Sequence, residues 1–351
     1  MKLRLLYVPL FCLGLAAPSQ ARAADPSLSK LFLQVDPAVV EIATVQQVVA
    51  DQGSARRVSS GSLGSGFLIS ADGLIMTAAH VVQVADALSV RFVTGDVVTA
   101  RVVASDPSSD VALIKAESVP AGIIPATLGD SDAAKIGDQV FVIGAPYGIA
   151  HSLTVGHISG RRTPDQLFGG FEKVELLQTD TAINEGNSGG PMFNMEGEAI
   201  GIVSHILSSS GGFQGIGFVI TSNIATHLLL DDPTPWTGLH GVLVEGPLAR
   251  ALNIPQGAGT LVESVAAGSP ASAIGLRPGK LKAQIADQSL ALGGDIILAV
   301  NGILVGSPDF NRRISDSVRA LSGDDRLILR VLRDGDIIEL NKPVSALGFD
   351  E

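Results

Sequence analysis

The feature that most constrains this chain is a succession of short apolar runs, separated by glycine and by Asp/Ser turns, from about Val39 to Thr221. The runs are rich in β-branched residues and include Gly66–Ser70, Val97–Val103, Val111–Lys115, Gln139–Ile143 and Ala199–Val203. Closely spaced runs of this kind are typical of antiparallel strands. The composition agrees, because 40 glycines and an aromatic content of only 4% suit many short strands joined by turns. We therefore predict a mainly β region, built as a barrel or a sandwich.

A second region follows the polar, proline-bearing stretch from Asp231 to Trp236, which breaks both strand and helix periodicity. We interpret this stretch as an interdomain linker, since 351 residues are more than one core usually holds. Beyond it, strand-like and helix-like runs alternate, which predicts a small α+β domain. The expected strands are Gly259–Val265, Asp295–Val300 and Arg326–Leu332, and the expected helices are Ser269–Ile274 and Ser307–Leu321.

The N-terminus has the order of a secretory signal peptide. Lys2 and Arg4 precede an apolar run from Leu5 to Ala17, and Ala21-Arg22-Ala23 supplies small residues for a cleavage site. The alternative is a membrane anchor, but about 13 apolar residues are few for a span. We expect cleavage after Ala23, which also removes Cys12, the only cysteine.

The net charge argues against nucleic acid as a partner. The full chain has 24 basic and 35 acidic residues; without Lys2, Arg4 and Arg22 the basic count is 21, and the net charge is −14. Such a surface repels phosphate backbones, and no basic run offsets it.

Three motifs together predict acyl-transfer chemistry. A run of small residues presents His80, a Pro-Ser-Ser turn delivers Asp110 at the head of an apolar strand, and glycines bracket Ser188. A serine hydroxyl needs a base within hydrogen-bonding reach, and imidazole suits that role near neutral pH. An aspartate fixes the tautomer of the imidazole and stabilises its protonated form. The backbone amides around Gly186, Asn187 and Ser188 are the expected oxyanion hole.

Each motif has a plainer interpretation when it is taken alone. A histidine at a strand end is more often structural, an aspartate beside Pro-Ser-Ser is usually a turn former, and Gly-Asn-Ser-Gly-Gly occurs in ordinary loops. Their joint presence in the order His, Asp, Ser favours the catalytic interpretation.

The same residues resemble those of a known family. Thr77-Ala-Ala-His80, Asp110–Lys115 and Gly186-Asn-Ser188-Gly-Gly-Pro191 look like the trypsin-like serine proteases. Gln178–Asn184 and Gly215–Ile220 narrow the resemblance to the HtrA/Deg stress proteases, and it extends from about Asp36 to the C-terminus.

The resemblance implies a chymotrypsin-like double β-barrel with its active site between the barrels, followed by a small α+β PDZ domain. We expect a signal peptide at 1–23, a protease domain at 24–230, a linker at 231–237 and a PDZ domain at 238–345. The resemblance implies no cofactor or metal. The histidines other than His80 show no metal-ligand spacing with carboxylates; they are His151, His157, His205, His227 and His240. It also implies a homotrimer or a multiple of it, with Leu28–Val35 as an expected contact.

Within the second domain, Thr237, Gly238 and Leu239 resemble the PDZ loop that holds a peptide carboxylate on backbone amides while the peptide adds as a strand. Gly268–Leu276 and Gly294–Gly302 resemble the helix and the strand that follow. Here the chain departs from the family, because Lys280–Leu292 intervenes between that helix and strand. The insertion predicts a longer loop or altered ligand access.

Two segments are candidates for substrate binding. Ala182, about six residues before the nucleophile, is expected at the base of the primary pocket with Ile183 beside it. Because neither is charged, we expect a preference for small or medium aliphatic residues over Lys and Arg. Val203, Ser204 and His205 are expected to form one wall of the substrate channel.

Three functions remain open at this point. The leading hypothesis is a periplasmic or secreted, ATP-independent endopeptidase that degrades unfolded or damaged envelope proteins and binds C-terminal peptides at its PDZ domain. It could contact a membrane surface, although no anchor is expected. One alternative is a regulatory protease with a single signalling substrate. The other is a PDZ chaperone or scaffold with an inactive protease fold.

Overall fold

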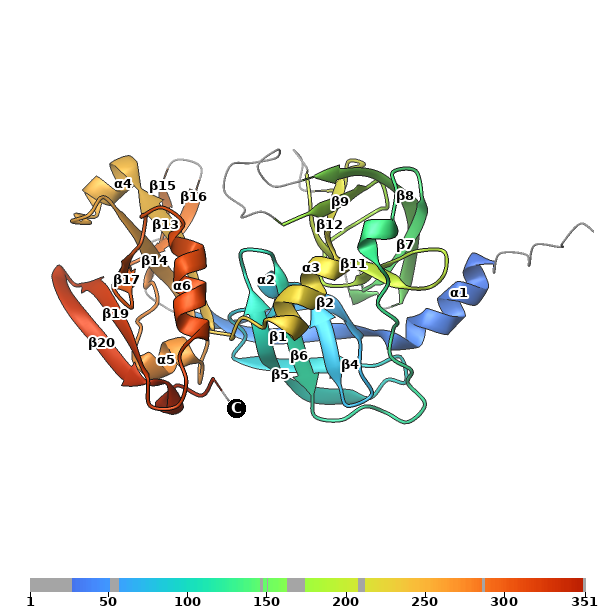
Figure 1. Cartoon of the computed structure of the whole chain (residues 1–351), viewed down its shortest axis with the longest axis horizontal. Coiled ribbons are helices and arrows are strands. Elements are labelled where there is room, and N and C mark those ends of the chain that lie inside the picture. Colours follow the sequence, from blue (N-terminus) through green and yellow to red (C-terminus); the bar gives the residue numbers. More distant parts are fainter. Residues whose placement is uncertain are drawn as a thin grey trace, which may run out of the picture.

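The computed structural model describes residues 27–50, 57–145, 148–149, 151–162, 174–207, 212–285 and 288–349. The expected signal peptide and its cleavage site after Ala23 lie outside these residues. Two closed barrels of six antiparallel strands follow one another along the chain, and a third sheet lies beside them (Figure 1). The mainly β prediction is confirmed, and the two barrels are the chymotrypsin fold that the resemblance implied.

The first barrel is closed in the order β1-β2-β3-β6-β5-β4. Its strands are β1 (Val39–Val49), β2 (Arg57–Leu68), β3 (Leu74–Thr77), β4 (Ala87–Arg91), β5 (Val97–Asp106) and β6 (Val111–Ala116). A short helix, α2 (Ala79–Val82), follows β3 directly. The long β1–β2 pairing runs from Val39 opposite Phe67 to Val49 opposite Arg57.

The second barrel is closed in the order β10-β11-β12-β9-β8-β7. Its strands are β7 (Gln139–Gly144), β8 (Ser152–Arg162), β9 (Leu176–Thr179), β10 (Pro191–Phe193), β11 (Ala199–Ile206) and β12 (Gly217–Thr221). A 3-10 turn, η2 (Ser131–Ala133), precedes it, and α3 (Ser222–Thr226) follows it and continues as a π-helical turn, η5 (His227–Asp231).

One hydrophobic cluster joins the two barrels. It includes Phe67 and Met76 from the first barrel and Phe141 and Phe193 from the second, all no more than 1% exposed. The rings of Phe141 and Phe193 stack with centroids 5.3 Å apart. Because this cluster buries apolar surface from both barrels, it fixes the barrels relative to each other and so positions any site between them.

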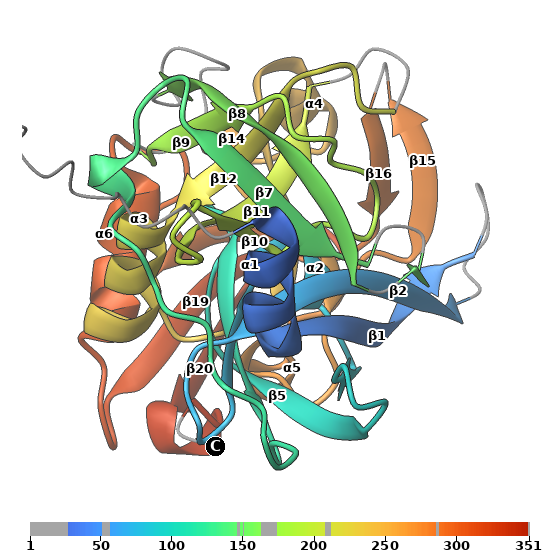
Figure 2. The ribbon, with the colours of Figure 1, turned by 90° about the vertical axis from the view of Figure 1, so that its right-hand side faces the viewer.

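The N-terminal helix covers one end of this cluster. Helix α1 (Leu28–Val35) is followed by the turn η1 (Asp36–Ala38) and lies across the second barrel (Figure 2). Its Leu31 and Val35 are buried in the shared cluster, whereas Leu33 is 73% exposed. Among the described helices, none is long and apolar enough to cross a membrane.

The third sheet has the order β13-β14-β17-β19-β20, with β18 paired to β17. The strands are β13 (Leu239–Glu245), β14 (Ala258–Val265), β17 (Ile296–Val300), β18 (Ile303–Leu304), β19 (Arg326–Arg333) and β20 (Asp336–Pro343). The accompanying helices are α4 (Gly246–Ala251), α5 (Pro270–Ile274), α6 (Phe310–Arg319) and the 3-10 turn η6 (Val344–Ala346). As expected from serine followed by proline, Ser269 caps α5 by accepting from the amide of Ser272.

The insertion between α5 and β17 is a separate hairpin. Its strands, β15 (Leu281–Ile285) and β16 (Gln288–Leu292), pair with each other from Leu281 opposite Leu292 to Ile285 opposite Gln288. Leu290 is 3% exposed and belongs to a buried cluster with Leu261 and Ile296 of the sheet. The inserted segment is therefore built onto the sheet rather than left as an open loop.

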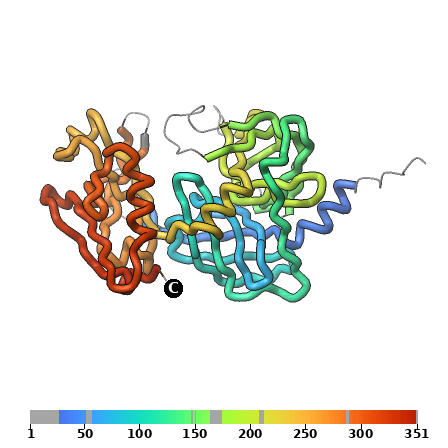
Figure 3. The backbone as a smooth tube through the Cα atoms, in the orientation of Figure 1, coloured from blue at the N-terminus to red at the C-terminus, as the bar shows by residue number. Residues whose placement is uncertain are grey.

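The chain returns along the first barrel before it enters the third sheet (Figure 3). The amide of Ser105 donates to the carbonyl of Thr234 over 3.0 Å, and Ala104 forms an isolated bridge with Pro235. The expected linker is thus packed against β5. Gln83, the residue after α2, accepts from the indole nitrogen of Trp236 over 2.9 Å through its backbone carbonyl.

Candidate active site

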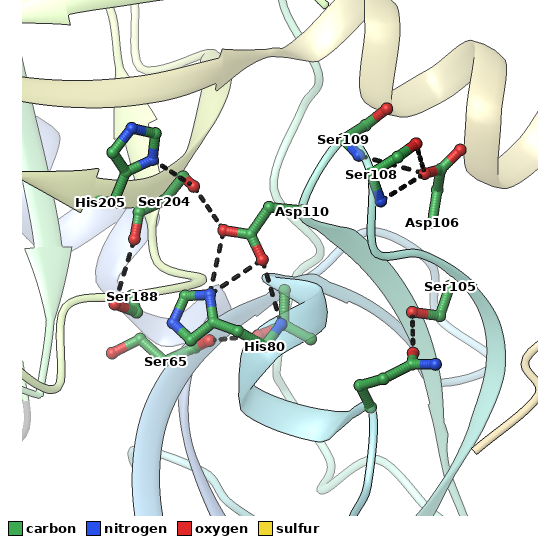
Figure 4. A network of polar contacts seen from close by, with 12 residues as sticks. Ser65, His80, Ser105, Asp106, Ser108, Ser109, Asp110, Ser188, Ser204 and His205 are labelled. Atoms are coloured by element: carbon green, nitrogen blue, oxygen red, sulfur yellow. Dashed lines mark hydrogen bonds and ion pairs between the residues drawn. The ribbon is translucent and has the colours of Figure 1, made fainter. Parts of the chain in front are cut away.

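His80 and Asp110 come from neighbouring parts of the first barrel. His80 is the second residue of α2, and Asp110 ends the turn between β5 and β6 with φ of 54°, a left-handed conformation that is uncommon outside glycine. The ring Nδ1 of His80 lies 2.9 Å from Asp110 Oδ1 and 3.0 Å from Oδ2. The backbone amide of His80 also donates to Oδ1 over 3.0 Å. Figure 4 shows these contacts, which fix the ring with Nδ1 against the carboxylate.

The contacts shift both groups toward their charged forms. Desolvation alone lowers the pKa of His80, but the hydrogen bond and the charge of Asp110 outweigh it and raise that pKa above its ordinary value. Desolvation likewise favours the neutral form of Asp110, yet the hydrogen bonds from His80 and Ser204 lower the pKa of the carboxyl. Asp110 is therefore ionised, and it holds the imidazole with its proton on Nδ1.

Ser188 lies in a sharp turn between β9 and β10. Gly186 and Gly189 adopt φ of 99° and 83°, and a Cβ on Gly189 would lie only 2.2 Å from Thr77 Oγ1 and 2.3 Å from the carbonyl oxygen of Ser65. The sequence needs glycine there for both reasons. The hydroxyl of Ser188 donates to the carbonyl of Ser204 over 3.4 Å. Among the described residues it makes no hydrogen bond to His80, so the hydroxyl and the ring must come within hydrogen-bonding reach before any proton transfer.

The turn provides two amides that suit an oxyanion hole. Within the described ranges, the backbone amides of Gly186 and Ser188 have no hydrogen-bond acceptor. The intervening Asn187 is 1% exposed, its amide donates to Asn184 over 3.0 Å, and its Oδ1 is buried without a partner. Two amides left open beside a serine hydroxyl match what a tetrahedral oxyanion requires.

Ser65, on β2, braces this turn and was missed by sequence reasoning. Its hydroxyl donates to the carbonyl of Gly186 over 2.7 Å and accepts from the amide of Ala145 over 2.9 Å. Its amide donates to the carbonyl of Ser188 over 2.8 Å. Ser65 is fully buried, and the one signal in the sequence is a small polar residue between glycines just before an apolar run.

The strand β11, on which a wall of the substrate channel is predicted, lies beside the turn that carries Ser188. The amide of Val203 donates to the carbonyl of Gly190, and its carbonyl accepts from the amide of Gly189. The side chain of Val203 is buried. The backbone positions that could pair with an extended substrate therefore begin at Ser204. The Ser204 hydroxyl donates to Asp110 Oδ2, and His205, which is exposed, places Nδ1 3.0 Å from the same hydroxyl.

The segment predicted to form the primary pocket is apolar at Ile183, which is buried in the core. Ile183 is 2% exposed, belongs to the core cluster of the second barrel, and faces Gly217, where a Cβ would lie 2.5 Å from Ile183 Cδ1. The partly buried Ile206 and Phe213 pack against the same cluster. The carbonyl of Ala182 accepts from Thr154 Oγ1 over 3.0 Å, which holds the segment before the nucleophile turn.

Two of the remaining histidines lie beside a carboxylate. His151 lies 2.7 Å from Asp36 and His240 lies 3.5 Å from Glu263. In the part of the chain that the structure describes, no group of three or more His, Cys, Asp or Glu residues could hold a metal ion.

The loop before β13 lies close to α2. Gln83 Nε2 donates to the carbonyl of Leu239 over 2.9 Å and lies 3.5 Å from Thr237 Oγ1. The carbonyl oxygens of Gly238 and Thr237 accept from the amides of Ala266 and Ala271. The predicted carboxylate loop is therefore held both by its own sheet and by the segment that carries His80.

Comparison with known proteins agrees with this geometry. Residues 64–202 match the model of a trypsin-like peptidase domain. A protein named probable periplasmic serine endoprotease DegP-like, from Pseudomonas putida (strain GB-1), is 34% identical over an alignment covering 99% of this chain and 76% of its own length. The chain belongs to the HtrA/DegP-like family of serine endoproteases. A relative of the same description from Hahella chejuensis is 33% identical, with 98% and 75% covered.

Solved structures of the family support the same assignment. The HtrA-type protease AlgW with a tripeptide matches this HtrA/DegP-like chain with a TM-score of 0.51 and 30% identity, covering 91% of this chain and 96% of that one. AlgW with a decapeptide matches with a TM-score of 0.51 and 28% identity over 90% and 97%. The resemblance inferred from the motifs is thus confirmed over both the barrels and the PDZ region.

Proposed function

We propose that this HtrA/DegP-like protease is an ATP-independent periplasmic endopeptidase that cuts unfolded or damaged envelope proteins, with Ser188 as nucleophile, His80 as general base and Asp110 as the residue that orients it. The observation that carries the proposal is one connected set of contacts: Asp110 holds His80, and Ser204 touches both Asp110 and Ser188. A scaffold has no need of such a network.

The proposed chemistry follows from the protonation states. Because His80 Nδ1 donates to Asp110, Nε2 carries the lone pair that takes the proton of Ser188 as Oγ attacks the peptide carbonyl. The imidazolium then gives this proton to the leaving amine. The amides of Gly186 and Ser188 would hold the oxyanion, which is worth about 3 kcal/mol per donor in comparable sites. Water repeats the sequence on the acyl-enzyme.

The location and the ends of the domains are part of the proposal. A leader cleaved after Ala23 would deliver the chain to the periplasm, in keeping with the names of its relatives. The protease domain would span 24–230, the linker 231–237 and the PDZ domain 238–345. The apolar surroundings of Ile183 favour cleavage after aliphatic residues, and Ser204 to Ile206 offers backbone to an extended substrate.

The PDZ domain is proposed to bind C-terminal peptides at the edge of β13, with Thr237, Gly238 and Leu239 at the carboxylate. AlgW is known in structures with a tripeptide and with a decapeptide. A homotrimer is proposed to assemble through the outer face of α1. Leu31 and Val35 are used in the chain's own core, so the exposed Leu33 is the residue available for that contact.

The test compares the chain from Ala24 onward with its Ser188→Ala variant, using unfolded casein and a serine-reactive fluorophosphonate probe. Ser307→Ala, at a partly exposed serine in the turn before α6 and outside both barrels, is the matched control. Cleavage and labelling in wild type and control, both lost in Ser188→Ala, would support the proposal. Absence of labelling, with and without added C-terminal peptides, would favour the chaperone or scaffold alternative. Activity only with an added peptide would favour the regulatory protease.

A further inference from the structure

The proton on the Ser204 hydroxyl decides how His205 is bound. This hydroxyl has one hydrogen, and it contacts both Asp110 Oδ2 and His205 Nδ1. Asp110 is ionised and can only accept, so it takes the hydrogen of Ser204. Ser204 Oγ must then accept from His205, whose Nδ1 therefore carries a proton. The contacts thus specify the tautomer of His205 as well as that of His80.

The position of the His205 ring is set by packing. Its centroid lies 5.1 Å from that of Phe218 on the paired strand β12, at a tilt of 33°. A bulge in the pairing of β11 with β12 falls between Val203 and His205, and it lets consecutive residues, Ser204 and His205, both reach the carboxylate's side of the strand. Figure 4 shows the resulting chain of contacts from His205 through Ser204 to Asp110 and His80.

His205 stays neutral over the range in which His80 can act as a base. Desolvation lowers the pKa of His205, and the charge of Asp110 only partly opposes this, while His80 lowers it further. The pKa of His80 is raised. As the pH falls, His80 is therefore protonated first, and its charge then disfavours protonation of His205. His205 acts as a neutral donor, not as a second titrating switch.

We propose that His205 is a positioning residue for catalysis: its Nδ1–H donates to Ser204 Oγ, which aligns and strengthens the bond from Ser204 to Asp110 and so sets how strongly Asp110 holds His80. This inference rests on the proposed triad. Hydrogen bonds in a chain polarise one another, so a donor behind Ser204 disperses the charge of Asp110. Loss of that donor leaves more charge facing His80 and raises the pKa of its ring.

Three substitutions at His205 distinguish the effect of its N–H donor from the effect of its ring packing. His205→Asn keeps a neutral N–H close to the position of Nδ1, His205→Phe keeps a ring against Phe218 without a donor, and His205→Ala keeps neither. For each, the second-order rate constant of fluorophosphonate labelling is measured against pH, and kcat and KM are measured on one peptide substrate. We expect the acid limb to move to higher pH by several tenths of a unit in the Phe and Ala variants, and to stay in place in the Asn variant.

A double substitution adds a second check. With Ser204→Ala already present, His205→Ala should no longer move the acid limb, because the link to Asp110 is broken. An unchanged acid limb in all three single variants, or a change confined to KM, would overturn the inference and leave His205 as a wall of the substrate channel. If the wild-type protein is still labelled by the fluorophosphonate, such a result would leave the proposed function unaffected. If the wild-type protein is not labelled, the proposed function itself would be refuted.

Discussion

Ser65 Oγ, on a strand of the first barrel, donates to the carbonyl of Gly186, in the nucleophile turn of the second barrel, over 2.7 Å. This bond, with the one that Ser65 accepts from Ala145, holds the Gly186–Asn187 peptide, which lies between the two amides proposed for the oxyanion hole. The shape of the turn therefore depends on a residue that carries no chemistry itself.

Ser65→Ala should lower kcat with little change in KM. It leaves the carbonyl of Gly186 and the amide of Ala145 buried without partners, a cost of about 1–3 kcal/mol in stability. Steady-state kinetics on a peptide substrate, beside chemical denaturation, would measure both effects. Ser65→Cys, a similar size with a weak donor, should lie between. A variant with wild-type kcat would show that the turn holds its shape unaided.

Asp110→Asn should reduce kcat by about four orders of magnitude, with the fold intact. The amide cannot hold His80 with its proton on Nδ1 as the carboxylate does, so the ring loses both tautomer and electrostatic support. Fluorophosphonate labelling rates, with circular dichroism as the control for folding, would check this. Labelling at the wild-type rate would remove Asp110 from the catalytic group.

The pH dependence follows from the raised pKa of His80. In the proposed mechanism the neutral ring is the base, so kcat/KM should fall as pH decreases through a midpoint above the ordinary value for histidine. For stability the sign is opposite. A raised folded-state pKa contributes stability that is fully present below the unfolded-state pKa and is lost as pH rises through the folded-state value. Denaturation of His80→Ala from acid to neutral pH should therefore show no decrease in the free energy of unfolding from this residue as the pH rises.

Gly189→Ala should inactivate the enzyme and destabilise it. A methyl group there would meet Thr77 and the backbone of Ser65 at less than van der Waals distance, and φ of 83° is strained for alanine. Gly212→Ala, where nothing lies within 4 Å of an added Cβ, is the control and should have little effect. Thermal unfolding would measure the loss of stability, and labelling of Ser188 would measure the loss of activity. A Gly189→Ala protein that is both labelled and stable would contradict the structure.

Arg333→Met should destabilise the third sheet selectively. Arg333 forms a charge-assisted pair of 2.7 Å with Asp295, which is 1% exposed and would be left as an unpaired buried charge. The expected loss is about 3 kcal/mol or more. Limited proteolysis should cut first within 239–343, while Ser188 labelling persists. Simultaneous loss of labelling would mean that the barrels need the third sheet to fold.

Many strands and the three catalytic motifs can be predicted from short local sequence patterns. The runs Val97–Val103 and Val111–Lys115 became β5 and β6 because β-branched alternation and turn residues act over a few positions. The local motifs around His80, Asp110 and Ser188 predict acyl-transfer chemistry from residue type and order alone. The hydrogen bonds that link β2 to the nucleophile turn join residues more than 100 positions apart, and no local pattern reveals Ser65. The contact of His205 with Ser204 depends on a β-bulge, which the apolar pattern of β11 does not encode.

The place of Gln83 has one more consequence. Its side chain is 5% exposed and satisfied by the carbonyl of Leu239 and the hydroxyl of Ser105, while its own carbonyl accepts from Trp236. If the third sheet moved away, a buried amide would lose a partner three positions after His80. Separation of the third sheet would therefore loosen the end of the segment that holds His80, while the contact of Gln83 with Ser105 would keep that segment attached to the first barrel.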